Sequence, residues 1–218
     1  MLAHRVRRQL ALTLSFLGAL ACGDYTSSTS PLSYTKTLPP SYTTSAAFSV
    51  VAGGTKARAV RWGADHSRVE QSVSAVVGPD GGILSLPGSD FSMTIPVGAL
   101  SAPTNVTVVS RGGAVVIFDM LPHGLKFLKP VTATQSLRNT AVYRTDASHA
   151  VRSAYLSRDQ EQVGADDSAS PSELEAATTY YYGETPVAET QVWILNHFSR
   201  YILISGIWLD VSIPSSNP

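Results

Sequence analysis

The sequence has almost no cysteine: Cys22 is the only one in 218 residues. A lone cysteine cannot form an internal disulfide, so an apolar core must hold any folded domain together. After the first eight residues Lys and Arg do not cluster, and their number in the whole chain, 16, equals that of Asp and Glu. A surface without a basic patch is a poor partner for nucleic acid. Long apolar runs are scarce as well: the run from Leu10 to Leu20 is shorter than the ~20 residues of a membrane-spanning helix.

The first 21 residues have the three parts of an export signal. A basic start (Arg5, Arg7, Arg8) precedes the apolar run, and small residues at 19–21 precede Cys22. A cysteine directly after the cut resembles the lipobox of bacterial lipoproteins, in which that cysteine carries the lipid and becomes the new N-terminus. The resemblance implies an exported protein of the bacterial cell envelope, anchored in a membrane through Cys22. Because residues 19–21 also fit an ordinary cleavage site, secretion in soluble form is the alternative.

The stretch after Cys22 has too few apolar residues to form a core. Residues 24–49 are largely Ser, Thr, Tyr and Pro, without apolar periodicity. Such a chain cannot bury enough apolar surface to offset the entropy lost on ordering it. We therefore expect residues 22–50 to form a disordered polar tether. Without the three arginines of the signal, the mature chain keeps 13 basic and 16 acidic residues, a net charge of −3.

From residue 73 onward, short apolar segments alternate with Gly, Pro, Asn and Asp, which favour turns. Phe91, Met93 and Ile95 alternate with polar residues, as in a strand with one buried face. Similar patterns predict strands at 105–108, 114–118, 125–134, 192–198 and 201–205. Together they predict an all-β fold, an antiparallel β-sandwich over residues 73–206, with residues 207–218 as a C-terminal tail.

Two segments allow more than one interpretation. Residues 51–72 contain the strand-like Ala59-Val60-Arg61-Trp62, which leaves open whether an edge strand precedes the sandwich. Pro171 to Thr178 tolerates a short helical turn, which Ser170 would cap.

Four blocks of sequence follow one another between residues 78 and 201. They are Gly81-Gly82; Pro96-Val97-Gly98-Ala99-Leu100 with Pro103-Thr104 and Val106-Thr107-Val108; Pro122-His123-Gly124-Leu125-Lys126-Phe127 with Lys129-Pro130-Val131; and His197-Phe198-Ser199-Arg200-Tyr201. In this order they resemble a ZU-five domain, the type found in zonula-occludens proteins, netrin receptors and ankyrins. The resemblance implies a β-sandwich over about residues 73–206.

The chain also departs from that family. Residues 157–182 match poorly and are predicted to be an insertion. The sequence contains no death domain and no ankyrin repeats, so the scaffold functions of the eukaryotic members do not carry over. Signal, polar tether and one sandwich resemble the layout of bacterial exported proteins that contain such a domain.

The triplet His197-Phe198-Ser199 has a specific chemistry attached to it. The same residues mark the cut in some self-cleaving domains, where the Ser hydroxyl attacks the preceding carbonyl, here that of Phe198. His197 would act as the general base, and water would then hydrolyse the ester. The competing interpretation is structural: in a strand His197 and Ser199 share one face, while Phe198 is buried on the other.

Tyr180-Tyr181-Tyr182 is the second candidate site, as an aromatic platform on which a sugar ring would stack. Because successive strand residues point to opposite faces, at least one of the three rings should point inward.

The sequence predicts no metal site, no cofactor and no enzyme. His66, His123 and His149 are far apart and lack the spacing of metal ligands, and no signature of a hydrolase or of a phosphate-binding loop occurs. The resulting hypothesis is a lipid-anchored, non-catalytic interaction or structural module of the cell envelope, with an unknown protein or polysaccharide partner. The alternatives are a domain that cleaves itself between Phe198 and Ser199, and a carbohydrate-binding module that uses the tyrosines.

Overall fold

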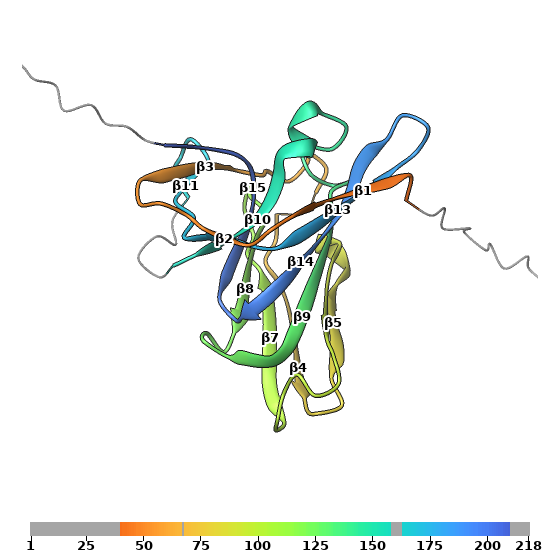
Figure 1. Cartoon of the computed structure of the whole chain (residues 1–218), viewed down its shortest axis with the longest axis vertical. Helices are drawn as coiled ribbons and strands as arrows, with labels where there is room; N and C mark the ends of the chain where they lie inside the picture. Colours follow the sequence, from red (N-terminus) through yellow and green to blue (C-terminus); the bar gives the residue numbers. More distant parts are fainter. Residues whose placement is uncertain (1–39, 67, 158–162, 210–218) are drawn as a thin grey trace, which may run out of the picture. The chain divides into compact units, whose positions relative to one another are not determined.

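A computed structural model describes residues 40–66, 68–157 and 163–209, and these form an almost entirely β structure. The predicted signal, Cys22 and the first part of the predicted tether lie outside the described residues. Two antiparallel sheets make up the fold, as the alternation of apolar and polar residues predicts (Figure 1). No helix within the described ranges is long and apolar enough to cross a membrane.

The first sheet has six strands in the order β1-β13-β14-β9-β6-β5. Its strands are β1 (Tyr42–Ala46), β13 (Ala177–Tyr182), β14 (Val187–His197), β9 (Lys126–Ser136), β6 (Phe91–Ile95) and β5 (Gly82–Leu86).

The second sheet has nine strands, of which seven follow the order β2-β12-β10-β15-β8-β7-β4, while β3 pairs with β11 and β15. These strands are β2 (Ser49–Val50), β12 (Glu173–Leu174), β10 (Val151–Leu156), β15 (Arg200–Leu209), β8 (Ile117–Leu121), β7 (Thr104–Ser110), β4 (Gln71–Val77), β3 (Thr55–Ala59) and β11 (Ser168–Ala169). Two short 3₁₀ turns, η1 (Pro87–Ser89) and η2 (Asp146–Ala150), connect strands.

The main core lies between the sheets and follows the period of two that the sequence shows. In β6 the buried residues are Phe91, Met93 and Ile95, and in β14 they include Trp193 and Leu195. The Phe91 ring packs on Phe118 of the other sheet, with 4.2 Å between ring centroids. Tertiary packing of alternate residues therefore explains the predicted strands at 91–95 and 192–198.

A second, smaller apolar cluster lies on the opposite face of β15. Ile202 and Ile204 belong to this cluster, whereas Tyr201 and Leu203 belong to the main core. Strand β3 contributes Ala57 and Ala59 to it and pairs with β15. A strand therefore does occur within residues 51–72, but it ends at Ala59, where the strand-like segment of the sequence begins, and Arg61 and Trp62 form only isolated bridges. The apolar side chains on both faces of β15 reflect burial on both sides.

Three sequence-based predictions are wrong. The sequence predicts a C-terminal tail from residue 207, but β15 continues to Leu209 and pairs with β3 there. The composition predicts a tether up to residue 50, but β1 pairs with β13 and β2 pairs with β12 (Figure 1). The helical turn that the sequence allows at 171–178 does not form, because Glu173–Leu174 and Ala177–Tyr182 are strands. In each case the hydrogen bonds come from a distant partner strand, which local composition does not indicate.

The four blocks of the ZU-five resemblance meet in two pairs. Gly81 has φ +73°, and a Cβ there would lie 2.3 Å from the carbonyl oxygen of Ile95, next to the second block. The amide of Gly98 in turn donates to the carbonyl of Pro79 at 2.6 Å. The third and fourth blocks meet at Phe198, whose amide donates to the carbonyl of Leu125 at 2.8 Å. These residues therefore build turns and strand contacts.

Candidate functional site

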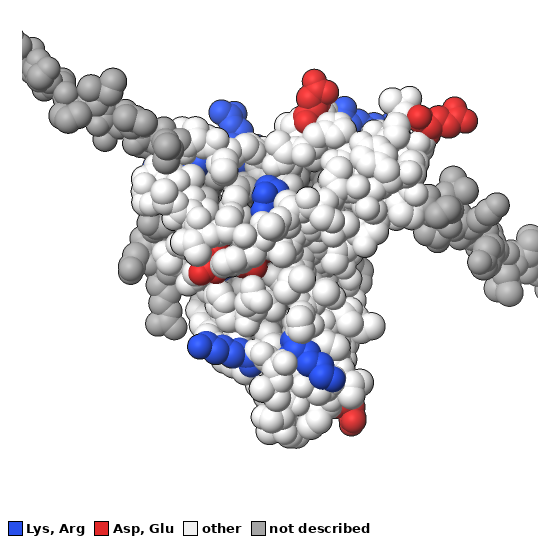
Figure 2. Space-filling model, viewed as in Figure 1, with Lys and Arg blue, Asp and Glu red and all other residues white. Residues whose placement is uncertain are grey.

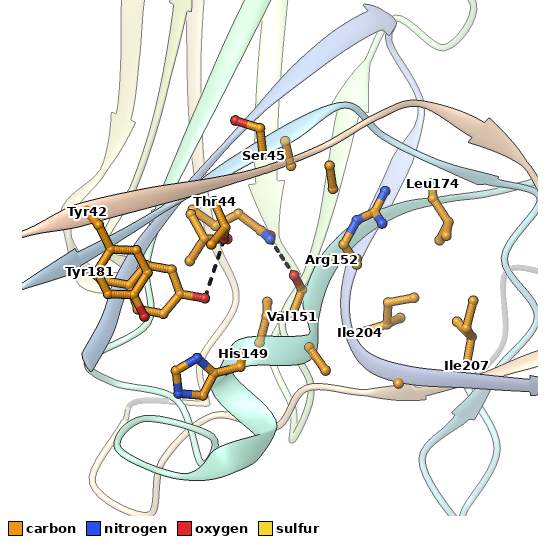
Figure 3. A pocket seen from close by; sticks show the side chains of 16 residues that line it. Tyr42, Thr44, Ser45, His149, Val151, Arg152, Leu174, Tyr181, Ile204 and Ile207 are labelled. Atoms are coloured by element: carbon orange, nitrogen blue, oxygen red, sulfur yellow. Dashed lines mark hydrogen bonds between the residues drawn. The ribbon is translucent and has the colours of Figure 1, made fainter. Parts of the chain in front are cut away.

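A half-open pocket lies where β1 and β13 of the six-stranded sheet approach β10 and β15 of the nine-stranded sheet. Its volume is about 520 Å³, within the range of pockets that bind small molecules. Figure 3 shows three parts of its wall. The rings of Tyr42, Tyr181 and His149 lie at one end, and the guanidinium of Arg152 lies in the middle. The aliphatic side chains of Leu174, Ile204 and Ile207 lie at the other end.

The aromatic end is a stack of three rings. The rings of Tyr42 and Tyr181 lie 4.3 Å apart and nearly parallel, and the His149 imidazole stacks on Tyr181 at 5.3 Å. Tyr181 is only 2% exposed, whereas Tyr42 is 42% exposed. The hydroxyl of Thr44 lies 3.5 Å from that of Tyr181. The stack therefore fixes β1 on β13 and leaves one tyrosine of the two at the surface.

The three consecutive tyrosines of the sequence divide between the two faces of β13, as expected. Tyr181 is the one that points inward, while Tyr180 and Tyr182 are half-buried. A sugar ring cannot stack on the face of a ring enclosed between Tyr42 and His149, so the platform expected from these tyrosines does not include Tyr181. Sequence reasoning did not select Tyr42 or His149 for this site, because Tyr42 lay in the predicted tether.

Arg152 is the charged residue in the middle of the pocket wall. Its Nη2 donates to the carbonyl oxygen of Ala47 at 2.9 Å and to that of Glu175 at 3.3 Å. Burial lowers the pKa of its guanidinium. Within the described ranges no carboxylate lies within 4.0 Å of it. Arg152 is thus a partly desolvated cation without an anionic partner in the described protein.

The His197-Phe198-Ser199 triplet lies where the chain passes from one sheet to the other: His197 is the last residue of β14, and Phe198 and Ser199 connect it to β15. Phe198 is fully buried, as the structural interpretation expected, and Ser199 is 8% exposed. The amide of Gly124 donates to the carbonyl oxygen of Phe198 at 2.7 Å, and the amide of Met120 donates to that of Ser199 at 2.9 Å. The turn is therefore bonded to β8 through Met120 and to the β8–β9 connection through Gly124.

His197 lies in an aromatic environment. The edge of the Tyr155 ring meets its imidazole at 4.9 Å, and the hydroxyl of Tyr201 donates to the carbonyl oxygen of His197 at 2.6 Å. Burial lowers the pKa of the His197 imidazole, and only a weaker opposing effect comes from Glu173. A neutral imidazole at neutral pH is the form that accepts a proton.

A buried ion network follows directly after the triplet. Arg200 is 7% exposed and donates through Nε and Nη2 to the carboxylate of Asp119, which is 4% exposed, at 2.8 and 3.0 Å. Arg111 donates to the same carboxylate. Burial opposes the charged form of Asp119, but the hydrogen bonds from Arg200 and Arg111 outweigh it and hold the pKa of this carboxyl below its ordinary value. The network fixes the start of β15 against β8.

A second buried acid has no such partner. Glu175 is 0% exposed, and neither oxygen of its carboxyl group has a hydrogen-bond partner in the described protein. Burial, with a smaller effect of Glu173, raises the pKa of Glu175 to about 7. Nothing in the sequence distinguishes this glutamate from the acids of a solvated loop.

The other histidines do not form a site together. Among the described residues, no group of three His, Cys, Asp or Glu is placed to hold a metal ion. His66 stacks on Trp62 at 3.8 Å, and His123 lies 3.7 Å from Asp119.

No protein-family model matches the chain, and no curated protein matches it. The ZU-five resemblance therefore stays a prediction from the sequence, and the functional argument rests on the geometry of the pocket and of the turn.

Proposed function

We propose that this protein is a non-catalytic binding module of the bacterial cell envelope, exported and held at a membrane by lipid on Cys22. The observation that supports binding is the pocket between the sheets, with aromatic rings, an arginine that has no counter-ion among the described residues, and aliphatic side chains on its wall. Concave sites with an apolar lining and a few polar groups are typical of ligand-binding pockets. The lone cysteine behind the export signal supports the anchor.

Native mass spectrometry of the full chain from its own membranes tests the binding function. We expect a non-covalent small-molecule mass on the chain, which Ala46→Phe removes because Ala46 lines the pocket. Thr43→Phe is the matched control, since Thr43 lies on the same strand, is exposed and does not line the pocket. A chain that carries no ligand, or whose ligand survives Ala46→Phe, contradicts this function.

A domain that cleaves itself between Phe198 and Ser199 is the second candidate. It is favoured by the amide of Gly124, which donates to the carbonyl that Ser199 would attack and would stabilise the charge that develops on its oxygen. Within the described ranges the non-glycine residues with positive φ are Asp90, Arg144 and Asp167, so the turn has no backbone strain of this kind. This is why we rank it second.

The fragment pattern of Ser199→Ala separates the two candidates. A binding module gives one intact chain with and without the substitution. A self-cleaving domain gives two fragments that become one chain when the hydroxyl is removed. Thr190→Val, on the same strand as His197 but away from the turn, controls for the loss of a hydroxyl.

A further inference from the structure

The charge of Arg152 favours a ligand that carries an anionic group. A cation that is partly removed from water and has no anion beside it is unfavourable, and a bound anion relieves this cost. Glu175 does not supply that anion: its backbone carbonyl accepts from Arg152, but its carboxyl group has no hydrogen-bond partner in the described protein. In Figure 2, basic atoms over β10 are bordered by uncharged surface toward β13, while acidic atoms lie below them in this view, near β2.

The guanidinium keeps donors for a ligand. The two backbone acceptors both bind Nη2, so among the described residues Nη1 keeps its hydrogens for a ligand, whereas Nε is buried without a hydrogen-bond partner and lies out of a ligand's reach. A carboxylate is the anion that matches such a group, because planar N–H donors and two oxygens form charge-assisted bonds.

The surface beside Arg152 is apolar and continues beyond the pocket. Leu174 and Ile207 line this pocket and also an adjacent one of about 380 Å³, whose wall includes Val50 and Trp208. Val50 is 74% exposed and Trp208 43%. An aliphatic path thus leads from the guanidinium past Leu174 and Ile207 to an exposed tryptophan, and Figure 3 shows its first part to the right of Arg152.

We propose that the pocket binds a fatty acid, with the carboxylate at Arg152 and the hydrocarbon chain along Leu174 and Ile207 toward Trp208. One end of the site requires an anion and the other end buries an apolar chain, and a long-chain carboxylate satisfies both. The proposal rests on the proposed function, because it names the ligand class of the same pocket.

Titration calorimetry of the full chain with Cys22→Ser, which carries no lipid of its own, tests this with four probes. We expect decanoate to bind, decan-1-ol to bind about tenfold more weakly because it lacks the charge, and acetate and decylamine not to bind measurably. Equal affinities for decanoate and decan-1-ol, or binding of decylamine, would overturn the proposal. This ligand series needs no substitution in the pocket, so it holds even where a pocket variant does not fold.

Two substitutions then locate the carboxylate. Arg152→Gln is expected to weaken decanoate binding about tenfold and to leave decan-1-ol unchanged, since only the charge-assisted bonds are lost. Arg58→Gln removes an exposed arginine of β3 that does not line the pocket and leaves both affinities as they are. An unchanged decanoate affinity in folded Arg152→Gln overturns the placement.

Tryptophan fluorescence tests whether the hydrocarbon chain of the ligand reaches Trp208. Trp62 and Trp193 are 3% and 1% exposed, so Trp208 dominates any response to a bound ligand. Decanoate should shift the emission to shorter wavelength, and Trp208→Phe should abolish the shift without abolishing the heat of binding. A shift that survives Trp208→Phe contradicts the path.

The outcomes separate this proposal from the binding function itself. If native mass spectrometry finds a ligand that Ala46→Phe removes but decanoate does not bind, the fatty acid is wrong and the binding module stands. Arg152-dependent binding of an oligosaccharide that contains glucuronate, with none of decanoate, would assign the pocket to an acidic sugar. If neither a native ligand nor decanoate binds, both proposals fail.

Discussion

Asp119 and Glu175 are both buried acids, but their surroundings give them opposite properties. Asp119 accepts hydrogen bonds from two arginines, which hold its pKa low despite burial. The carboxyl group of Glu175 has no hydrogen-bond donor and no cation within 4.0 Å among the described residues, so burial raises its pKa. Removal from water penalises a charge, and only specific partners reverse that penalty.

The raised pKa of Glu175 predicts a pH-dependent stability. Between its ordinary value of 4.5 and about 7, the folded chain holds a proton that the unfolded chain has released. The free energy of unfolding therefore falls as the pH rises through this window, by on the order of 3 kcal/mol for this group. Urea denaturation at pH 5 and pH 8 measures the fall, and Glu175→Gln should remove it.

The lowered pKa values of His66 and His197 have the opposite effect: these two groups lower the free energy of unfolding as the pH falls below 6.5. They are present in both chains, so the difference between wild type and Glu175→Gln isolates the glutamate. Glu184→Gln, at an exposed position, serves as the control. A wild type and a Glu175→Gln variant with the same pH dependence would contradict the account.

Gly81 provides a prediction about the backbone. Its φ is +73°, and a Cβ at this position would lie 2.3 Å from the carbonyl oxygen of Ile95, so a side chain is excluded. Gly81→Ala should lower the free energy of unfolding by about 3 kcal/mol or more. At Gly54, φ is +82° but nothing lies within 4 Å, so Gly54→Ala reports the backbone strain alone and should cost about 1 kcal/mol. Equal costs in urea denaturation would show that the close contact is irrelevant.

At the scale of elements, the connection from β14 to β15 is held by the β8–β9 connection on one side and by the Asp119–Arg200 pair on the other. Both features act on neighbouring residues of the chain, so the block from His197 to Tyr201 has a structural role whether or not the turn has any chemistry. The same connection brings the last two blocks of the ZU-five resemblance together.

Removing one partner of this buried pair should destabilise the fold strongly. Asp119→Asn leaves Arg200 without its carboxylate and should cost about 3 kcal/mol of unfolding free energy. Asp167→Asn breaks the Arg61–Asp167 pair, whose arginine side chain is 47% exposed, and should cost less than about 1 kcal/mol. Chemical denaturation of both variants gives the comparison. Similar losses would mean that burial of the Asp119 pair does not matter.

The elements that the sequence predicted are those with a regular pattern. Alternation of apolar and polar residues located β6, β7, β9 and β14, because in these strands one face alone is buried. It failed at β1, whose residues are all exposed or half-buried and which owes its order to pairing with β13. An edge strand of Thr and Ser has the composition of a tether, so only its partner strand distinguishes the two.

The candidate pocket was beyond sequence reasoning for the same reason. Its lining comes from β1, β10, β12, β13, β14, β15 and η2, which are far apart in the chain. Of the residues discussed as sites in the sequence, Tyr181 belongs to it, and there as a buried ring. Arg152 and Glu175 have no local pattern that marks them as special, because their properties follow from burial and from the absence of an ion-pair partner among the described residues.

At the scale of the whole molecule, we propose a β-sandwich that has a binding pocket between its two sheets and a lipid anchor at Cys22. The segment from β1 to β2 passes from the six-stranded to the nine-stranded sheet, and residues of β1 line the pocket (Figure 1). The first strand that follows the proposed anchor in the described sequence is therefore also a wall of the proposed binding site.

The intact mass of the protein extracted from its native membranes tests this account most directly. We predict a mass that corresponds to residues 22–218 plus acyl chains on Cys22. A chain that ends at Phe198 would contradict the non-catalytic module and make Ser199 a nucleophile. An intact chain that begins at Cys22 without lipid would contradict the anchor and leave a secreted β-sandwich.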